Sequence, residues 1–376
     1  GSMQPQNEAE RQVAAAAAEG READLAALAE GERLLRGAFL AALLFGEATD
    51  GGGRRVTVHR RGLSVRHARI SGEVDIRELG AIDGPAPALS LTHCAGAEGG
   101  GGFVLRASDA SLVRLDLSRS TLDLVVADAL RTTGDVLLER TTVRAGLVLR
   151  RAHIGGLLTL NGAALGASPE GVALGADGAR IESAVFLRPI EGHRFEAEGT
   201  VRLPGATIGG SLDLSGAALS PAEGDPERLV LSLRNTRIGD RLVVRSLAPA
   251  SAGVVDLSGA HVAGLDDVAA TGPGQLGWGP TCNGEPPRDP KTGALRGVAL
   301  RLHGFTYDTL ALPEGPHHPS NDLWLARRAW LRRQAPGAPC PRDFTPQPHE
   351  HLAKLLRALG EPAEADKVAR DKREWQ

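Results

Sequence analysis

Short alternations of apolar and polar residues return along this chain at a fixed step of eleven residues. The stretch "RRAHIGGLLTLNGAAL" at 150–165 is nearly repeated as "LPGATIGGSLDLSGAAL" at 203–219. Leu138, Leu149 and Leu160 lie eleven apart, and so do Leu203 and Leu214. More degenerate copies extend the pattern over about 56–265. A repeat of this kind indicates stacked supersecondary units.

Each Leu-x-Leu alternation predicts a short strand with one buried face, and Gly and Ala between the strands predict tight turns. Two steps of eleven give a coil of about twenty-two residues, the size of a square-sided coil. We therefore predict a mainly β fold, a right-handed β-helix (solenoid) over 51–265. An α/β domain would need helical segments of ten or more residues between the strands, and 56–265 contains none. The positions expected in the core are Leu149, Ile154, Leu160, Ile208 and Leu214.

A solenoid exposes its core at both ends, so each end needs a cap. We predict an N-terminal helical cap over 1–50. In 20–48, "GREADLAALAEGERLLRGAFLAALLFGEA", one helical stripe would carry Leu25, Leu28, Leu35, Phe39 and Leu43. An amphipathic membrane helix is the alternative, but its polar face would be mixed in charge rather than basic. The cap is the favoured interpretation.

The eleven-residue repeat is interrupted near residue 266. Residues 266–297 are rich in Gly and Pro, which predicts a long, mobile loop that a protease can reach. The candidate protease-sensitive positions are Asp266, Gly274, Cys282, Arg288 and Lys291. Residues 298–312 resemble one last coil. Residues 313–376 are predicted to form a C-terminal helical segment that ends in a helical hairpin, with an apolar stripe of Leu352, Leu355, Leu356 and Leu359.

Composition narrows the class of protein. Among 376 residues the aromatic share is 3% and the net charge is -3, so the core must be aliphatic and no basic face for nucleic acid is expected. Cys94, Cys282 and Cys340 are too widely spaced for a disulfide framework or a CxxC site. The most apolar run, 37–46, is far shorter than the ~20 residues of a membrane span.

The two ends of the chain carry their own signals. "GSM" at the start is typical of a tag remnant before the initiator Met3. At the other end a basic cluster precedes a Trp, as on the cytoplasmic side of a membrane span. We expect the native chain to continue past Gln376 into a membrane segment. The candidate membrane-proximal residues are Lys367, Arg370, Lys372, Arg373 and Trp375.

Four stretches of the chain match the motifs of a known family: "ATIGGSLDLSGA", "GFTYDTL", "RRAWLRRQ" and "FTPQPHEHLAKLLRALGEPAEADKV". The chain resembles a bacterial, actinobacterial-type solenoid family with "ARIGGxLDLSGA" repeats and a "PQPYEQLA" tail. The resemblance covers nearly the whole chain. Members are often labelled "membrane-associated oxidoreductase" or pentapeptide-like, and they commonly continue into hydrophobic C-terminal segments. The family brings no established catalytic residues. His349 and His351 stand where its motif has Tyr and Gln.

The residues do not support the oxidoreductase label. The glycine-rich "GAEGGGG" at 96–102 is followed by no helix, and the chain has no GxxxxGK[ST] and no CxxC. "PHEH" lacks the second His of HExxH because position 353 is Ala, so His349 and His351 are interpreted as surface residues. Cys94 is interpreted as a small buried hydrophobe beside His93. We expect no enzyme activity and no flavin, nicotinamide or zinc as cofactor.

Outward positions of the repeats suggest charged rows on the stacked coils. Arg69, His153, Arg180, Thr207, Arg237 and His261 would form a basic row. Asp75, Asp116, Asp123, Asp213 and Asp256 would form an acidic row. A solvated polar face that discourages edge pairing explains them as well as a ligand surface does, and is preferred.

The sequence favours a non-enzymatic scaffold or sensor, the solenoid portion of a membrane-anchored protein on the cytoplasmic face of the membrane. Its expected partners are proteins, among them a regulatory protease. A role as a regulated membrane effector in stress or phage defence rests on association alone. The alternative is a β-helix enzyme or ligand-binding protein with a site under the 266–297 loop. Clustered carboxylates or a metal there would favour that alternative.

Overall fold

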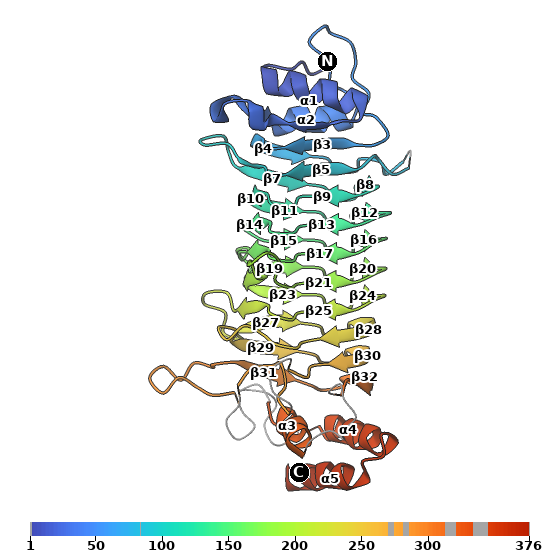
Figure 1. Cartoon of the computed structure of the whole chain (residues 1–376), viewed down its shortest axis with the longest axis vertical. Helices are drawn as coiled ribbons and strands as arrows, with labels where there is room; N and C mark the ends of the chain where they lie inside the picture. The colour runs from blue at the N-terminus through green and yellow to red at the C-terminus, as the bar shows by residue number, and fades with distance from the viewer. Residues whose placement is uncertain are drawn as a thin grey trace.

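Stacked short strands form one long column with helices at both ends (Figure 1). The computed structural model describes residues 2–82, 84–269, 274–280, 286–312, 321–333 and 345–375. All strand neighbours in the two long sheets are parallel, as the repeat predicts. The mainly β solenoid fold with helical ends is confirmed.

From β8 to β27 each coil contributes one strand to each of four faces, which we number in chain order. The first face contains β8 (Ser111–Leu112), β12 (Arg131–Thr132), β16 (His153–Ile154), β20 (Arg180–Ile181) and β24 (Thr207–Ile208). The second contains β1 (Glu22–Asp24), β3 (Leu63–Arg66), β5 (Leu89–Thr92), β9 (Leu115–Asp116), β13 (Val136–Leu137), β17 (Leu158–Thr159), β21 (Val185–Phe186) and β25 (Leu212–Asp213). Three longer strands, β28 (Arg237–Val243), β30 (His261–Asp266) and β32 (Thr306–Leu310), continue both faces.

The other two faces are built in the same way. The third contains β2 (Leu34–Arg36), β6 (Ala95–Gly96), β10 (Thr121–Leu122), β14 (Thr142–Val143), β18 (Ala164–Leu165), β22 (Glu196–Glu198) and β26 (Ala218–Ser220). The fourth contains β7 (Phe103–Arg106), β11 (Leu124–Val126), β15 (Leu147–Val148), β19 (Val172–Gly175), β23 (Thr200–Arg202), β27 (Leu229–Ser232), β29 (Gly253–Asp256) and β31 (Val298–Arg301). β4 (Arg69–Asp75) turns the corner and belongs to both.

The register explains the eleven-residue step. Arg131 pairs with His153 on the next coil, so one full coil equals two steps and each step covers half a coil. Leu149, Ile154, Leu160, Ile208 and Leu214 are all buried, as predicted. The alanine directly before a first-face or third-face strand is buried too, and we call these residues corner alanines. They precede the first face at Ala152, Ala179, Ala206 and Ala260 and the third face at Ala68, Ala163 and Ala217.

Glycines serve two different needs in the repeat. The residue before a corner alanine turns the chain with a positive φ, which Gly adopts at little cost, as at Gly205 (φ 66). The Gly-Gly pair has ordinary φ but lies against the coil beneath it. A Cβ on Gly155 would lie 2.4 Å from the carbonyl oxygen of Thr133, and one on Gly209 would lie 2.2 Å from that of Glu182. The Gly-Gly pair of the repeat is therefore required for one coil to stack closely on the next.

The N-terminal end differs from the prediction. Residues 20–48 are not one helix: β1 and β2 of this stretch already pair with the coil below, through Ala23 and Leu35. The helices are α1 (Glu8–Glu19) and the short α2 (Gly37–Leu44), with 3₁₀ turns at Leu25–Ala27 and Glu30–Glu32. The leucines fit a helical stripe, but pairing of the backbone with an open ladder outweighs helix propensity.

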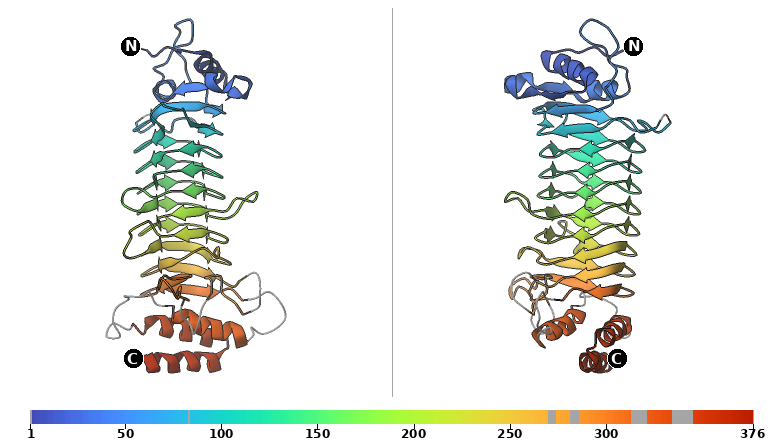
Figure 2. Two further views of the ribbon diagram at one scale, coloured as in Figure 1. Left: turned by 90° about the vertical axis from the view of Figure 1, so that its left-hand side faces the viewer. Right: turned by 45° about the vertical axis from the view of Figure 1, so that its right-hand side comes forward.

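At the other end α3 (Asn321–Leu331), α4 (Gln347–Ala358) and α5 (Pro362–Trp375) lie beyond the last strands, with α4 and α5 as an antiparallel hairpin (Figure 1). Figure 2 shows that loops project from the sides of the column between strands. No helix among the described residues is long and apolar enough to cross a bilayer.

We predict that Gly209→Ala destabilises the protein by about 1–3 kcal/mol, because the new methyl group collides with a main-chain carbonyl that cannot move alone. Thermal unfolding followed by circular dichroism measures it. Gly31→Ala is the matched control, since a Cβ there meets nothing within 4 Å. Equal melting temperatures for the two variants would contradict the stacking explanation.

Candidate functional site

The C-terminal end of the column is where the described chain departs most from the repeat. A further coil would bond to the outer edges of β31 and β32, and the described residues after β32 form helices instead. Unpaired edge groups are costly when buried and promote association when exposed. The residues that close these edges therefore define the local structure.

Arg333 closes the edge of β31. Its main-chain oxygen accepts from the Leu300 N–H at 2.5 Å, and its guanidinium Nη1 donates to the Val298 carbonyl at 3.0 Å. The same guanidinium donates to the carbonyls of Trp278 and Gly279. Burial lowers the pKa of Arg333 to about 10, so the side chain stays charged at neutral pH.

Two side chains one turn apart on α4 close the edge of β32. Gln347 accepts from the Gly304 N–H and donates to the Phe305 carbonyl, each at 3.0 Å. Nε2 of His351 lies 2.8 Å from the Tyr307 carbonyl and 3.1 Å from the Tyr307 nitrogen. These two residues of the "PQPHEHLA" segment thus replace the ladder of a missing coil.

The N-terminal end uses the same device. The Asn7 side chain donates to the Leu34 carbonyl on β2 at 2.9 Å. The buried carboxylate of Glu10 accepts from the main-chain N–H of Arg36 at 3.2 Å and forms an ion pair with its guanidinium at 2.7 Å. That carboxylate also raises the pKa of Arg36. A helix side chain therefore closes an open strand edge at each end.

An aromatic cluster fills the contact between the last coil and α3, which we call the terminal interface. The rings of Phe305, Tyr307 and Trp330 lie 5.4 to 6.3 Å apart between centroids. His351 meets Tyr307 edge-on at 4.6 Å. In a chain with 3% aromatic residues, this concentration marks the end of the column as a special contact.

A buried ion pair ties the 266–297 segment to α3. Both terminal guanidinium nitrogens of Arg327 donate to the Asp267 carboxylate, which also accepts from the Trp278 indole at 2.6 Å. Burial lowers the pKa of Arg327, but the charge and hydrogen bond of Asp267 raise it further. The pair is inaccessible to solvent. Removing either partner would leave an uncompensated buried charge.

A pocket of about 540 Å³ opens beside this interface, which we call the junction pocket. Among the described residues its walls come from 245–247, Ala269, the 274–280 stretch, α3 and Arg333. Its charged lining residues in the described part of the chain are Arg245 and Arg333. The other lining residues are Ser246, Leu247, Ala269, Gly274, Gln275, Leu276, Gly277, Gly279, Pro280, Ala326 and Trp330.

The predicted protease-sensitive residues divide into two groups. Asp266 is buried at the end of β30, and Gly274 is buried beside α3. Arg288 and Lys291 are exposed on a turn that Asp289 holds, with its pKa lowered to about 2 chiefly by Arg296. Cys282 lies outside the described residues. The prediction of one long exposed loop is therefore wrong for its inner part, which carries the buried Trp278.

The predicted membrane-proximal residues all lie on α5, the outermost helix. Lys367 forms an ion pair with Glu364 at 2.5 Å, and Lys372 forms one with Glu350 at 2.9 Å. Arg370 and Arg373 are exposed. For Trp375 the described structure gives the backbone position alone. The basic cluster that the sequence suggests is thus half neutralised.

The charged rows are corrected in part. His153, Arg180, Thr207, Arg237 and His261 stand in register on the first face, as predicted. Arg69, in contrast, pairs with Ala95 on the third face. Glu182 forms ion pairs with both His153 and Arg180, which makes this row a mixed surface.

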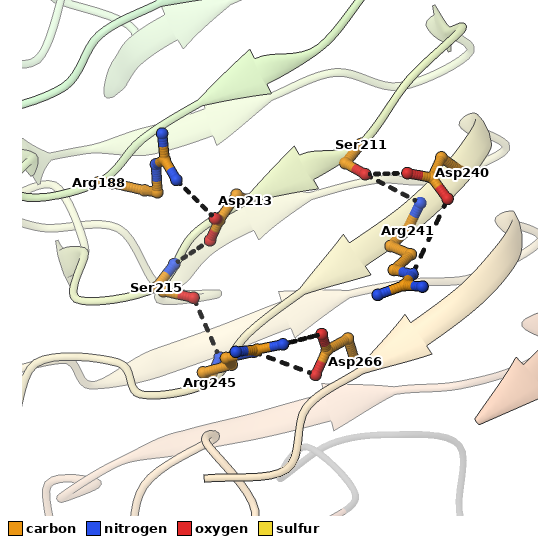
Figure 3. Close-up of polar contacts among 8 residues, drawn as sticks. All are labelled: Arg188, Ser211, Asp213, Ser215, Asp240, Arg241, Arg245 and Asp266. Carbon is orange, nitrogen blue, oxygen red and sulfur yellow. Dashed lines mark hydrogen bonds and ion pairs between the residues drawn. The ribbon is translucent and has the colours of Figure 1, made fainter. Parts of the chain in front are cut away.

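The aspartates do not form one row. Asp213 stands in register with Phe186 and Val243, whereas Asp75 and Asp256 each stand beside an arginine on the fourth face. Figure 3 shows ion pairs that cross between coils instead: Arg188 with Asp213 at 3.6 Å and Arg245 with Asp266 at 2.8 Å. Period-2 reasoning finds outward positions but does not say on which face each lies.

The burial of Cys94 and His349 tests the sequence-based interpretation of these two residues. Cys94 is buried, which raises the pKa of its thiol to about 12, so it behaves as a small hydrophobe, as predicted. His349 is not a surface residue: it is buried, and burial lowers its pKa to about 4. His349 falls on the same helical stripe as the buried Leu352 and Leu356, so this spacing could have indicated its burial from the sequence.

In comparisons with known proteins, no family model, curated protein or solved structure matches this chain.

We predict that the double variant Gln347→Ala/His351→Ala melts at a lower temperature and self-associates as concentration rises, because the edge of β32 loses its partners. Light scattering and thermal unfolding measure both effects. Lys354→Ala, an exposed change on the same helix, should alter neither. A double variant that stays monomeric with an unchanged melting temperature would refute this role for α4.

Trypsin should cut after Lys291 before it cuts anywhere in 56–265, because the turn at 288–293 is exposed whereas the repeats are held by ladders on both sides. Mass spectrometry of a limited digest identifies the site. Arg288→Gln/Lys291→Gln should remove this fragment, and Arg180→Gln on a ladder strand should not. A first cut within 56–265 would contradict the prediction.

Proposed function

We propose that this protein is a non-enzymatic scaffold and sensor, the solenoid portion of a membrane-anchored protein on the cytoplasmic side. The observation that carries the proposal is the terminal interface. Through it the helical segment is fixed to the column by buried rings and a buried ion pair. A displacement of α3 would therefore be transmitted to the last coil, and the reverse.

The column itself suits a scaffold. Its coils are spaced by the ~4.8 Å of neighbouring strands, its core is continuous from Val13 to Val368, and its edges are closed at both ends. A rigid, closed solenoid offers long lateral surfaces to protein partners without polymerising through its ends. The exposed turn around Lys291 would be the place where a regulatory protease acts.

The membrane part of the proposal depends on α5. Arg370 and Arg373 are exposed on the helix farthest from the column, where a C-terminal membrane segment would begin. Basic residues near an anionic leaflet contribute about 1 kcal/mol each. The paired Lys367 and Lys372 would contribute less, because their carboxylate partners cancel much of their charge.

We predict weak, salt-sensitive binding of this chain to vesicles that contain phosphatidylserine. Arg370→Gln/Arg373→Gln should weaken binding by about fivefold for each charge removed. Lys354→Gln/Arg357→Gln on α4 is the matched control, because it removes the same number of exposed positive charges. Co-sedimentation at low and high salt measures the effect. If the double variant and the control bind equally, α5 does not face the membrane, and the scaffold part of the proposal stands alone.

The junction pocket favours one part of the alternative function. Ala269 and residues of the 274–280 stretch line it, and the alternative hypothesis placed a ligand-binding or enzymatic site under the 266–297 loop. Because its charged walls are arginines, we propose ligand binding as the second candidate function.

A further inference from the structure

The junction pocket lies where a ligand would contact both the rigid column and the helical segment. On the column side it is lined by residues 245–247, which follow β28. On the other side it is lined by residues of the 274–280 stretch, which we call the insertion together with the rest of 266–297, and by Ala326 and Trp330 of α3. The volume of about 540 Å³ is within the range of pockets that hold small organic molecules. Its position, more than its size, suggests a regulatory site.

Three guanidinium groups lie at or beside this pocket, and two of them have a bonded carboxylate among the described residues. Asp266 pairs with Arg245, and Asp267 pairs with Arg327. Arg333 is the third guanidinium, and the hydrogen bonds of its side chain all go to neutral main-chain carbonyls. A buried cation without a bonded carboxylate is costly, so an anion nearby would be stabilising.

Arg245 is the guanidinium of this pocket that solvent reaches. About half of its side chain is exposed, while the nearly buried Asp266 holds the guanidinium in place with bonds of 2.8 to 3.3 Å. A guanidinium fixed in this way loses little entropy when it binds an oxyanion. Arg333 also lines the pocket, but it is almost completely buried and its guanidinium donates to main-chain carbonyls, so it contributes charge more than donors.

The rest of the lining describes the body of the ligand. Leu247, Leu276 and Ala326 provide aliphatic surface, and Trp330 provides an aromatic wall. Ser246 and Gln275 provide neutral polar groups. Such a lining fits a molecule with an apolar or planar body and one anionic end.

We propose that the junction pocket binds a small amphipathic anion, with a carboxylate or phosphate group toward Arg245 and an apolar body toward Trp330 and Ala326. This inference deepens the sensor part of the proposed function, since a ligand here would change how α3 sits on the last coil. It needs no membrane and no partner, so its failure leaves the scaffold proposal intact.

The experiment uses three probes of similar body: phenyl phosphate, phenylacetate and the neutral benzyl alcohol. Isothermal titration calorimetry on the intact chain should give saturable, one-to-one binding of at least one anion. The neutral alcohol should bind about tenfold more weakly or not at all. Which anion binds tighter distinguishes a phosphate ligand from a carboxylate ligand.

Three variants locate the binding. Arg245→Gln should weaken anion binding by about tenfold, and Ala326→Trp should abolish it by filling the pocket without removing any hydrogen bond. Arg241→Gln is the matched control, an exposed arginine on β28 that forms a long ion pair of 3.9 Å with Asp240. Thermal unfolding shows whether each variant is folded.

Absence of saturable binding by either anion would overturn the proposal. So would unchanged binding in a folded Ala326→Trp, or equal binding of benzyl alcohol. Loss of binding in Arg241→Gln as strong as in Arg245→Gln would show non-specific charge attraction and would overturn it too.

Discussion

The main-chain ladder between coils is the interaction on which this structure depends. Each coil is a set of strands only two to seven residues long, and no such strand is stable without partners above and below it. A stack of this kind has no natural stopping point. The two terminal coils must therefore find hydrogen-bond partners that are not strands. Asn7, Glu10, Gln347, His351 and Arg333 supply them from outside the ladder.

The two ends of the column are closed by different kinds of contact. The N-terminal end is closed by helices that pack small residues, such as Ala9 and Ala17, on the first coil. An ion pair between the buried Glu10 and the partly exposed Arg36 contributes to this closure. The C-terminal end instead uses a cluster of rings and an ion pair, Asp267 with Arg327, that is buried on both sides. A cap does not need such a ring cluster. The larger, more polar and more specific contact is expected where the position of the attached helix matters, because a buried ion pair adds specificity more reliably than stability.

The fold could be predicted from the sequence because its determinants are local and repeated. A buried Leu, a corner Ala and a stacking Gly recur at one step, so each coil confirms the reading of the next. The errors concern contacts between segments far apart in sequence. Residues 20–48 were expected to be helical because pairing with 63–75 cannot be seen in their own pattern. His351 was expected on the surface because the strand edge it closes lies 44 positions earlier.

The same reasoning explains why the candidate site was seen only in outline. A composition rich in Gly and Pro marks 266–297 as a departure from the repeat, but it does not show that the segment folds back under α3. That return depends on Asp267, Trp278 and Arg327, which come together from three separate stretches. The junction pocket lies beside this contact, lined by residues 245–247, by described residues of the insertion and by α3. A strictly regular solenoid has no such space. The place where the repeat fails is therefore also the place where this protein gains a surface with a specific chemistry.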